Sequence, residues 1–226
     1  MEVKVGARVL GANEAVAGEN RQRLAARGIY CINIISSPGA GKTTILEKTV
    51  EILKHKLRLA VIEGDITTTL DADRISAHHV AVHQINTFGG CHLDARMIRR
   101  ALDEFDLSNL DLLIVENVGN LICPADFELG EDAKVVVLSV PEGDDKPVKY
   151  PVIFQRAGVL LLNKVDLLQH SNFDQAKMRR DLKRLNPDLV IHETVATTGQ
   201  GLDQWCDWLV EQAKAKKAAM LRDEAK

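Results

Sequence analysis

The sequence is poor in aromatic residues and contains no long hydrophobic run. Aromatic side chains account for 4% of its 226 residues. No uninterrupted apolar stretch approaches the length of about 18 residues that a membrane-spanning helix needs, so we expect no association with a membrane. The chain also begins without a basic segment followed by an apolar run. We therefore expect no secretory signal and a cytoplasmic location.

An excess of positive charge is absent as well. The chain carries 29 basic and 32 acidic residues, which gives a formal net charge of −3. A protein that binds nucleic acid mainly through the phosphate backbone needs a surplus of lysine and arginine. We therefore expect no nucleic-acid partner.

Cysteine is scarce, with four residues in the whole chain. In a chain of this size that we place in the cytoplasm, we expect thiols for metal or redox chemistry rather than a disulfide framework. Cys31 falls inside a predicted strand and Cys206 on a predicted helix, where we expect small buried packing residues. Cys91 and Cys123 lie between predicted elements and remain available as ligands.

The sequence does contain enough apolar residues, 46%, for a sizeable core. Near-continuous apolar runs predict strands at 29–36, 58–65, 80–87, 110–117, 133–140 and 157–164. Helical spacing predicts helices at 14–27, 42–55, 92–104, 174–185 and 202–222. Buried strands separated by helices indicate an α/β fold, with a mostly parallel sheet in the middle of three α/β/α layers. We expect an N-terminal helical segment at 1–28 and one domain at 29–226.

The most informative motif is SSPGAGKTT, which follows a predicted strand and opens a predicted helix. That context is the one a phosphate-binding loop requires, so the domain is predicted to be a P-loop NTPase. Lys42 would reach the β- and γ-phosphates, and the Thr43 hydroxyl would hold Mg²⁺. The usual motif begins with glycine where this chain has Ser36, a position that shapes the turn and does no chemistry. The predicted phosphate-binding residues are Pro38, Gly39, Ala40, Gly41, Lys42, Thr43 and Thr44.

The motif NKVD, residues 163–166, predicts that the nucleotide is GTP or GDP. Asp166 can accept hydrogen bonds from guanine N1–H and from the exocyclic amine, and adenine offers no such pair. Asn163 would brace the loop and reach the base edge, and the stem of Lys164 would lie over the ring. The N–H of Ala196, in a later loop, would contact guanine O6. Such a motif also occurs by chance in turns, but here it ends a buried strand well after a phosphate-binding loop.

Two further strand ends are expected to place carboxylates near the γ-phosphate. Glu116 would orient a magnesium-bound or attacking water, and the N–H of Gly119 would sense the γ-phosphate. Asp65 leaves its predicted strand at the edge where ligands bind in parallel sheets, which makes it a candidate Mg²⁺ ligand. A plain strand-end charge at Glu116 and a capping role for Asp65 remain alternatives. The candidate catalytic residues are Lys42, Thr43, Glu116 and Asp65, of which Thr43, Asp65 and Glu116 would hold Mg²⁺.

Cys91 and His92 place two soft metal ligands side by side, directly after Gly89 and Gly90. Thiolate and imidazole suit nickel and zinc. Adjacent residues of a regular helix or strand point in different directions, so both can face one ion only in a turn, which the glycines permit. Cys123 is the predicted third ligand. The alternative is two isolated cysteines and a histidine at a helix start. A less favoured group of ligands is His78, His79 and His83.

Taken together, the motifs resemble the HypB family of GTPases, which help to insert nickel into [NiFe]-hydrogenases. The resemblance rests, in chain order, on SSPGAGKTT, EGDITTTLDADRI, GGCHLDA, ENVGNLICPADFELGE and NKVDLL. It implies slow GTP hydrolysis, a homodimer that forms on GTP binding, and a nickel or zinc site near the dimer interface. It also implies two kinds of partner, a HypA-like accessory protein and a hydrogenase large-subunit precursor.

This sequence departs from its relatives in three places. The related urease chaperone family, UreG, usually carries Cys-Pro-His, whereas Cys91 and His92 are adjacent here. Some HypB proteins have a cysteine-rich or histidine-rich N-terminal stretch that this sequence lacks, so we expect no nickel store of that kind. In the last guanine loop the family often has Ser-Ala-Lys, where this chain has Val195, Ala196 and Thr197.

The sequence leaves more than one function in view. A GTP-hydrolysing metallochaperone is the favoured hypothesis. The alternatives are a UreG-like urease nickel chaperone and a nucleotide-gated metal-binding scaffold without functional turnover. A P-loop kinase is disfavoured by NKVD and by the lack of an obvious lid or acceptor site.

Overall fold

One parallel sheet of seven strands forms the centre of the structure, a computed structural model that describes residues 2–65 and 74–224. Its strand order is β3-β2-β4-β1-β5-β6-β7, and every neighbouring pair is parallel. The predicted α/β fold is confirmed, and the sheet is wholly parallel among these described strands. The strands are β1 (Tyr30–Ser36), β2 (Leu59–Asp65), β3 (Ala81–Asn86), β4 (Leu112–Glu116), β5 (Ala133–Ser139), β6 (Ala157–Asn163) and β7 (Val190–Thr194).

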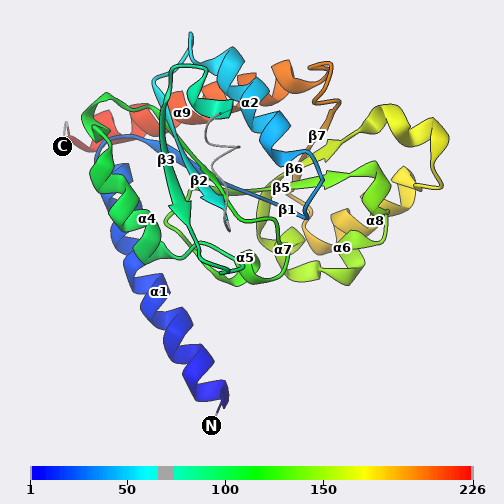
Figure 1. Cartoon of the computed structure of the whole chain (residues 1–226), viewed down its shortest axis with the longest axis horizontal. Coiled ribbons are helices and arrows are strands. Elements are labelled where there is room, and N and C mark those ends of the chain that lie inside the picture. The colour runs from blue at the N-terminus through cyan, green and yellow to red at the C-terminus, as the bar shows by residue number, and fades with distance from the viewer. Residues whose placement is uncertain (1, 66–73, 225–226) are drawn as a thin grey trace.

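Helices cover both faces of this sheet, as Figure 1 shows. On one face lie α2 (Lys42–Leu53) and α9 (Leu202–Glu224). The other face carries α1 (Glu2–Ala25), α4 (Ala95–Ala101), α5 (Cys123–Asp126), α6 (Lys146–Lys149), α7 (Pro151–Arg156) and α8 (Gln175–Leu185). Short 3₁₀ segments occupy Leu102–Glu104, Leu107–Asn109, Val140–Glu142 and Val165–His170. Among the described residues no helix is both long and apolar enough to cross a membrane.

The buried strands supply the core of both layers. Successive side chains of a strand point to opposite faces, so Ile32 and Ile34 of β1 pack in the layer of α2 and α9. Cys31, the residue before Ile32, packs on the other face with Leu24 of α1 and Ile98 of α4. All seven residues of β1 are buried. This two-sided burial explains why the strand reads as a continuous apolar run in the sequence.

Several elements differ from the sequence-based expectation. The first helix begins at Glu2 rather than at residue 14, because a glycine inside a helix costs only about 1 kcal/mol and Gly11 does not end it. The five-residue strand β7 was not predicted. It lies at the sheet edge, with one residue exposed and three only partly buried, so its apolar pattern is weak. The short helices α6 and α7 were also missed, and each has proline in its first turn.

A buried ion pair stabilises the loop that leads into β5. The carboxylate of Glu131 and the ammonium of Lys134 contact each other with side chains 2% and 3% exposed. Glu131 also accepts hydrogen bonds from the backbone N–H of Leu129 (2.6 Å) and from the Asn33 side chain (3.1 Å). Burial by itself would raise the pKa of Glu131, but the Lys134 charge and these hydrogen bonds lower the pKa below its ordinary value.

We expect Glu131→Gln to destabilise the protein by about 3 kcal/mol, because it leaves the Lys134 ammonium buried without its main counter-charge. Urea unfolding at pH 7 measures this loss. The stabilisation is present above the unfolded-state pKa of Glu131, about 4.5, and disappears as the pH falls through its lower folded-state pKa. The wild type should therefore lose stability below pH 4.5 more steeply than the variant.

The matched control is Glu19→Gln, which removes an exposed pair with Arg99 and should leave the free energy of unfolding nearly unchanged. Equal stability of Glu131→Gln and the wild type at pH 7 would contradict the prediction.

Candidate functional site

The loop between β1 and α2 has the geometry of an anion-binding loop. Gly39 and Gly41 both have positive φ angles, 77° and 97°, which glycine adopts without strain. A Cβ atom at Gly41 would lie 2.4 Å from the side-chain nitrogen of Asn163, so a larger residue would clash. No side chain among the described residues caps the start of α2. The N–H groups of the first turn of a helix point along its axis, which is the arrangement that binds a phosphate.

The carboxylate of Glu116 lies directly behind this loop and is fully buried. Its Oε1 atom accepts hydrogen bonds from the Lys42 ammonium and from the Thr43 hydroxyl, the latter at 2.7 Å. Its Oε2 atom is buried and has no hydrogen-bond partner among the residues that the structure describes. A buried carboxylate oxygen without a donor is costly. This geometry offers one position for a further cation or water.

A cavity of about 480 Å³ opens in front of the loop at the carboxyl ends of the strands. Lys42, Thr43, Asp65 and Gly119 line it, as the sequence predicts for a phosphate site. Gly119 lies against the loop, since a Cβ atom there would be 3.2 Å from the ring of Pro38. The loop predicted to follow Asp65 falls largely on residues 66–73, which are outside the described part of the chain.

The sequence analysis missed two charged residues of this cavity, Glu63 and Arg74. Glu63 is 2% exposed and pairs across the sheet with Glu116. It precedes Asp65 by two residues in β2, so period-two alternation could have identified it as a neighbour on the same face.

A smaller cavity of about 230 Å³ adjoins the first and shares Gly41, Thr44 and Lys164 with it. Asp166 and Ala196 line this second cavity. The residues predicted to bind guanine therefore lie beside the predicted phosphate site, and one ligand could extend through both cavities. Thr44 faces both cavities.

Asn163 holds the two loops of this region together. Its side-chain nitrogen donates to the carbonyl of Ala40 at 2.9 Å, and its side-chain oxygen accepts from the N–H of Ala196 at 3.1 Å. The side chain is thus a brace, as the sequence predicted. The N–H of Ala196, predicted to contact guanine O6, is here donated to Asn163. The Lys164 ammonium donates to the carbonyl of Gly39 at 2.7 Å, so its stem crosses between the two cavities.

The three predicted metal ligands come together on the neighbouring loops. One ligand atom each of Cys91, His92 and Cys123 lies within 4.8 Å of the others. Cys91 is exposed, and the other two are half-buried. A tetrahedral ion bound by three such ligands keeps one open position. Among the described residues this is the one group of three or more such side chains with that spacing.

The surroundings of Cys91 and His92 favour the neutral form of both side chains. A hydrogen bond with Cys123, together with burial, raises the pKa of the Cys91 thiol, so a bound metal has to displace its proton. Burial lowers the pKa of His92 and favours the neutral imidazole, which is the form that binds metals. The His92 ring lies 3.9 Å from the ring of Phe127, which fixes its orientation.

The turn before the ligands has the predicted glycine conformation. Gly89 has a φ angle of 92°, and the N–H of Gly90 donates to the carbonyl of Thr87 at 3.0 Å. A Cβ atom at Gly90 would lie 3.1 Å from that carbonyl oxygen. This tight turn directs the chain away from the line of β3, so Cys91 and His92 can both face Cys123.

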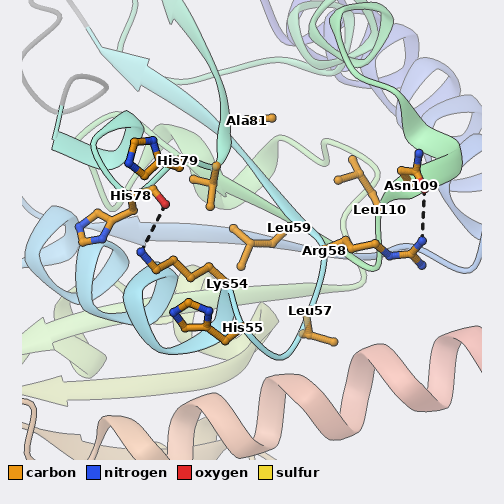
Figure 2. Close-up of a pocket in the computed structure, with 11 residues that line it drawn as sticks. Lys54, His55, Leu57, Arg58, Leu59, His78, His79, Ala81, Asn109 and Leu110 are labelled. Atoms are coloured by element: carbon orange, nitrogen blue, oxygen red, sulfur yellow. Dashed lines mark hydrogen bonds between the residues drawn. The ribbon is translucent and has the colours of Figure 1, made fainter.

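A separate cavity lies at the opposite end of the sheet, where β2 and β3 begin (Figure 2). Its lining includes His55, His78 and His79. Among the described residues, neither these three histidines nor the set of His78, His79 and His83 forms a cluster of metal-ligand atoms. Lys54 donates to the carbonyl of His78 at 3.5 Å. Basic groups at the C-terminal end of α2 are explained by the helix dipole.

Cys31 and Cys206 are buried packing residues, as predicted. Burial raises the pKa of the Cys206 thiol to about 12, so it stays protonated at neutral pH. The acidic residues Glu131 and Asp132 add to the effect of burial at Cys31, whose pKa also rises. Neither thiol is close to the ligand group.

Known proteins share both this fold and these motifs. The chain is 47% identical over 219 residues to the hydrogenase maturation factor HypB of Azotobacter chroococcum mcd 1, a match that covers 97% of this chain and 72% of the relative. It is 50% identical over 212 residues to HypB of Escherichia coli (strain K12), with 94% and 72% covered. The crystal structure of Helicobacter pylori HypB in complex with nickel matches with a TM-score of 0.85 and 38% identity, covering 91% of this chain and 97% of that one.

The family model for the CobW/HypB/UreG nucleotide-binding domain matches residues 30–193. This range contains the phosphate-binding loop, the NKVD motif and all three metal ligands, so the resemblance inferred from the sequence is confirmed. The chain therefore belongs to the CobW/HypB/UreG family and, within it, to the HypB hydrogenase maturation factors.

Proposed function

We propose that this chain is a GTP-hydrolysing metallochaperone that binds nickel and assists its insertion into a [NiFe]-hydrogenase. The observation that carries the proposal is the convergence of Cys91, His92 and Cys123 on one point beside the nucleotide cavities. Relatives named as hydrogenase maturation factors, one of them solved with nickel, support it. Zinc suits the same ligands and is the alternative cargo.

GTP would occupy the two adjoining cavities. The backbone N–H groups of the loop at residues 38–44 bind the phosphates, and Lys42 turns from Glu116 to the β- and γ-phosphates. In the smaller cavity Asp166 accepts from the guanine edge, and Lys164 covers the ring. Asn163 holds the loop of Ala196 beside the base, and the Ala196 N–H would be shared between Asn163 and guanine O6.

Mg²⁺ fits the phosphate end of the site. Thr43, Asp65 and Glu116 would provide oxygen ligands there. The Oε2 atom of Glu116, which has no hydrogen-bond partner among the described residues, is suited to such a cation or to a water that it holds. When bound, the ion would neutralise charge on the phosphates. Glu116 would orient the attacking water, and the N–H of Gly119 would contact the γ-phosphate. We propose slow hydrolysis.

One short segment would link the nucleotide to the metal. Gly119 contacts the phosphate-binding loop, and the next residue, Asn120, donates to the carbonyl of Cys91 at 3.3 Å. Asn117 accepts from the N–H of Leu93 at 3.1 Å. A shift of this segment toward the γ-phosphate would therefore move Cys123 relative to Cys91. GTP and GDP would then give different metal affinities.

The partners we propose are a second copy of this chain, a HypA-like accessory protein and a hydrogenase large-subunit precursor, in the cytoplasm. Exposed apolar side chains flank the metal ligands: Phe88 is 90% exposed and Ile122 is 63% exposed. A symmetric dimer that forms on GTP binding would cover them and would supply the remaining ligand position from the second chain.

The first test is nucleotide specificity. Asp166→Asn should weaken GTP binding and favour xanthine nucleotide, because an amide reverses the donor and acceptor pattern that guanine requires. Fluorescent-nucleotide titration with GTP, XTP and ATP measures the preference. Wild-type protein that bound ATP and GTP equally would rule out the assignment.

A second test separates the phosphate ligands. Lys42→Ala and Thr43→Ala should each reduce phosphate release from GTP at least about 100-fold, and excess Mg²⁺ should partly restore only Thr43→Ala. Lys42→Ala also leaves the buried Glu116 without its cation, so its melting temperature has to be measured alongside. Normal turnover in a folded Lys42→Ala protein would exclude the phosphate-binding role. Wild-type protein with no multiple turnover would favour a nucleotide-gated scaffold.

A third test addresses the metal site. Cys91→Ala, His92→Ala and Cys123→Ala should each weaken Ni²⁺ binding about 10-fold or more, and the wild-type affinity should differ between GDP and a non-hydrolysable GTP analogue. Competition with a chromophoric chelator gives the affinities, and Cys206→Ser, away from the site, is the control. Unchanged binding in the three variants would refute the site. Binding that ignored the nucleotide would refute the coupling.

A further inference from the structure

The N-terminal helix α1 carries two buried asparagines, Asn13 and Asn20, which are 6% and 1% exposed. They are about two helical turns apart, so both side chains leave α1 on the same face. A buried amide is costly unless it forms hydrogen bonds. Both asparagines direct their amide groups away from α1 to backbone atoms of two other segments.

The first of these segments is the start of α4. The N–H of Ala95 donates to the side-chain oxygen of Asn13 at 2.8 Å, and the carbonyl of Ala95 accepts from the side-chain nitrogen of Asn20 at 2.8 Å. The backbone N–H and carbonyl of Ala95 therefore both form hydrogen bonds with side chains of α1. Ala95 follows His92 by only three positions, across the capping residue Asp94.

The second segment follows Cys123. The side-chain nitrogen of Asn13 donates to the carbonyl of Glu128 at 2.7 Å, and that of Asn20 donates to the carbonyl of Leu129 at 2.8 Å. Each asparagine thus has one bond to Ala95 and one to this segment. The ring of Phe127, next to Glu128, also lies against the ring of His92, with 3.9 Å between the ring centroids.

The sheet alone does not bring these segments together. The Cys91–His92 loop follows β3, whereas Cys123 follows β4, and β2 lies between the two strands. With neighbouring strands about 4.8 Å apart, their ends are about 10 Å apart. Further contacts above the sheet have to close that distance to the 4.8 Å observed between the ligand atoms.

At the Asn13 end of this junction the side chains of α1 do not pack closely against the two segments. A cavity of about 350 Å³ separates Val9 and Ala12 of α1 from Asp94 and Phe127. Closer to Asn20 the helix does touch the loop, because a Cβ atom at Gly130 would lie 2.6 Å from the Cβ of Asn20. The amide bonds are therefore the buried polar connection between α1 and the two ligand-bearing segments, beside an exposed ion pair of Arg21 with Glu128 at 3.2 Å.

We propose that Asn13 and Asn20 are positioning residues of the metal site, which hold the Cys91–His92 loop and the Cys123 segment at the spacing that one ion requires. This inference rests on the proposed metal binding by these ligands. The second shell of a metal site commonly governs affinity about 10- to 100-fold. Here that shell would consist of the hydrogen bonds that Asn13 and Asn20 of α1 form with backbone atoms next to the ligands.

The test uses Asn13→Ala and Asn20→Ala in the full chain. We expect each to weaken Ni²⁺ binding about 10-fold and to reduce the thiolate-to-nickel absorption band, with GDP affinity unchanged. A metal-free readout is capture by a trivalent arsenical, which needs two neighbouring thiols. We expect slower and weaker capture in both variants than in the wild type.

The matched control is Glu19→Ala, which removes an exposed link between α1 and Arg99 of α4 without touching Ala95 or Glu128. It should behave as the wild type in every assay. If Asn20→Ala does not fold, Asn13→Ala decides the matter, because it keeps both bonds of Asn20.

Wild-type nickel affinity, absorption and arsenical capture in a folded asparagine variant would overturn the positioning role. If the wild type itself bound nickel without need of Cys91 and Cys123, the proposed function would fail instead. The arsenical result would still show whether the asparagines set the distance between the thiols.

Discussion

The buried carboxylate of Glu116 is the group on which the functional end of this sheet depends. A carboxylate with no exposed surface is stable only when cations or hydrogen-bond donors surround it, and Lys42 and Thr43 supply both. Because these donors belong to the first turn of α2, satisfying Glu116 also fixes the phosphate-binding loop against β4. The second oxygen is buried and has no donor among the described residues.

The end of β4 also leads from the cavity at the phosphate-binding loop to the group of Cys91, His92 and Cys123. Beyond Glu116 the chain passes the phosphate cavity at Gly119 and reaches Cys123 within one short segment. Neutral amides hold this segment: Asn117 donates to Asn33 at 3.1 Å and accepts from Leu93. Amide networks position loops without adding buried charge, and each bond is lost completely when its partner moves. A nucleotide-dependent metal site is a natural use of such a segment.

Much of this was predictable because it is local. The phosphate-binding loop needs a strand, two glycines and a helix in succession, and the residues at 29–55 show all of them. The adjacency of Cys91 and His92 after Gly89 indicated a turn, which the structure has. The weak strand β7 was not predictable, because an edge strand with half-exposed residues lacks the continuous apolar run of β1. The role of Asn33 was not predicted either, although an asparagine inside a buried strand signals a buried hydrogen-bond network.

The sequence by itself determined the α/β class, the nucleotide motifs and the residues that we propose as metal ligands, because each depends on residue type and short spacing. Only the tertiary structure decided which strand ends are neighbours. The order β3-β2-β4 places Glu63 beside Glu116 and leaves a strand between the two metal-binding loops. It also brought Asn13 and Asn20 against segments more than seventy residues away. Crossover connections set these neighbours, and a local sequence period reports only which face of an element is buried.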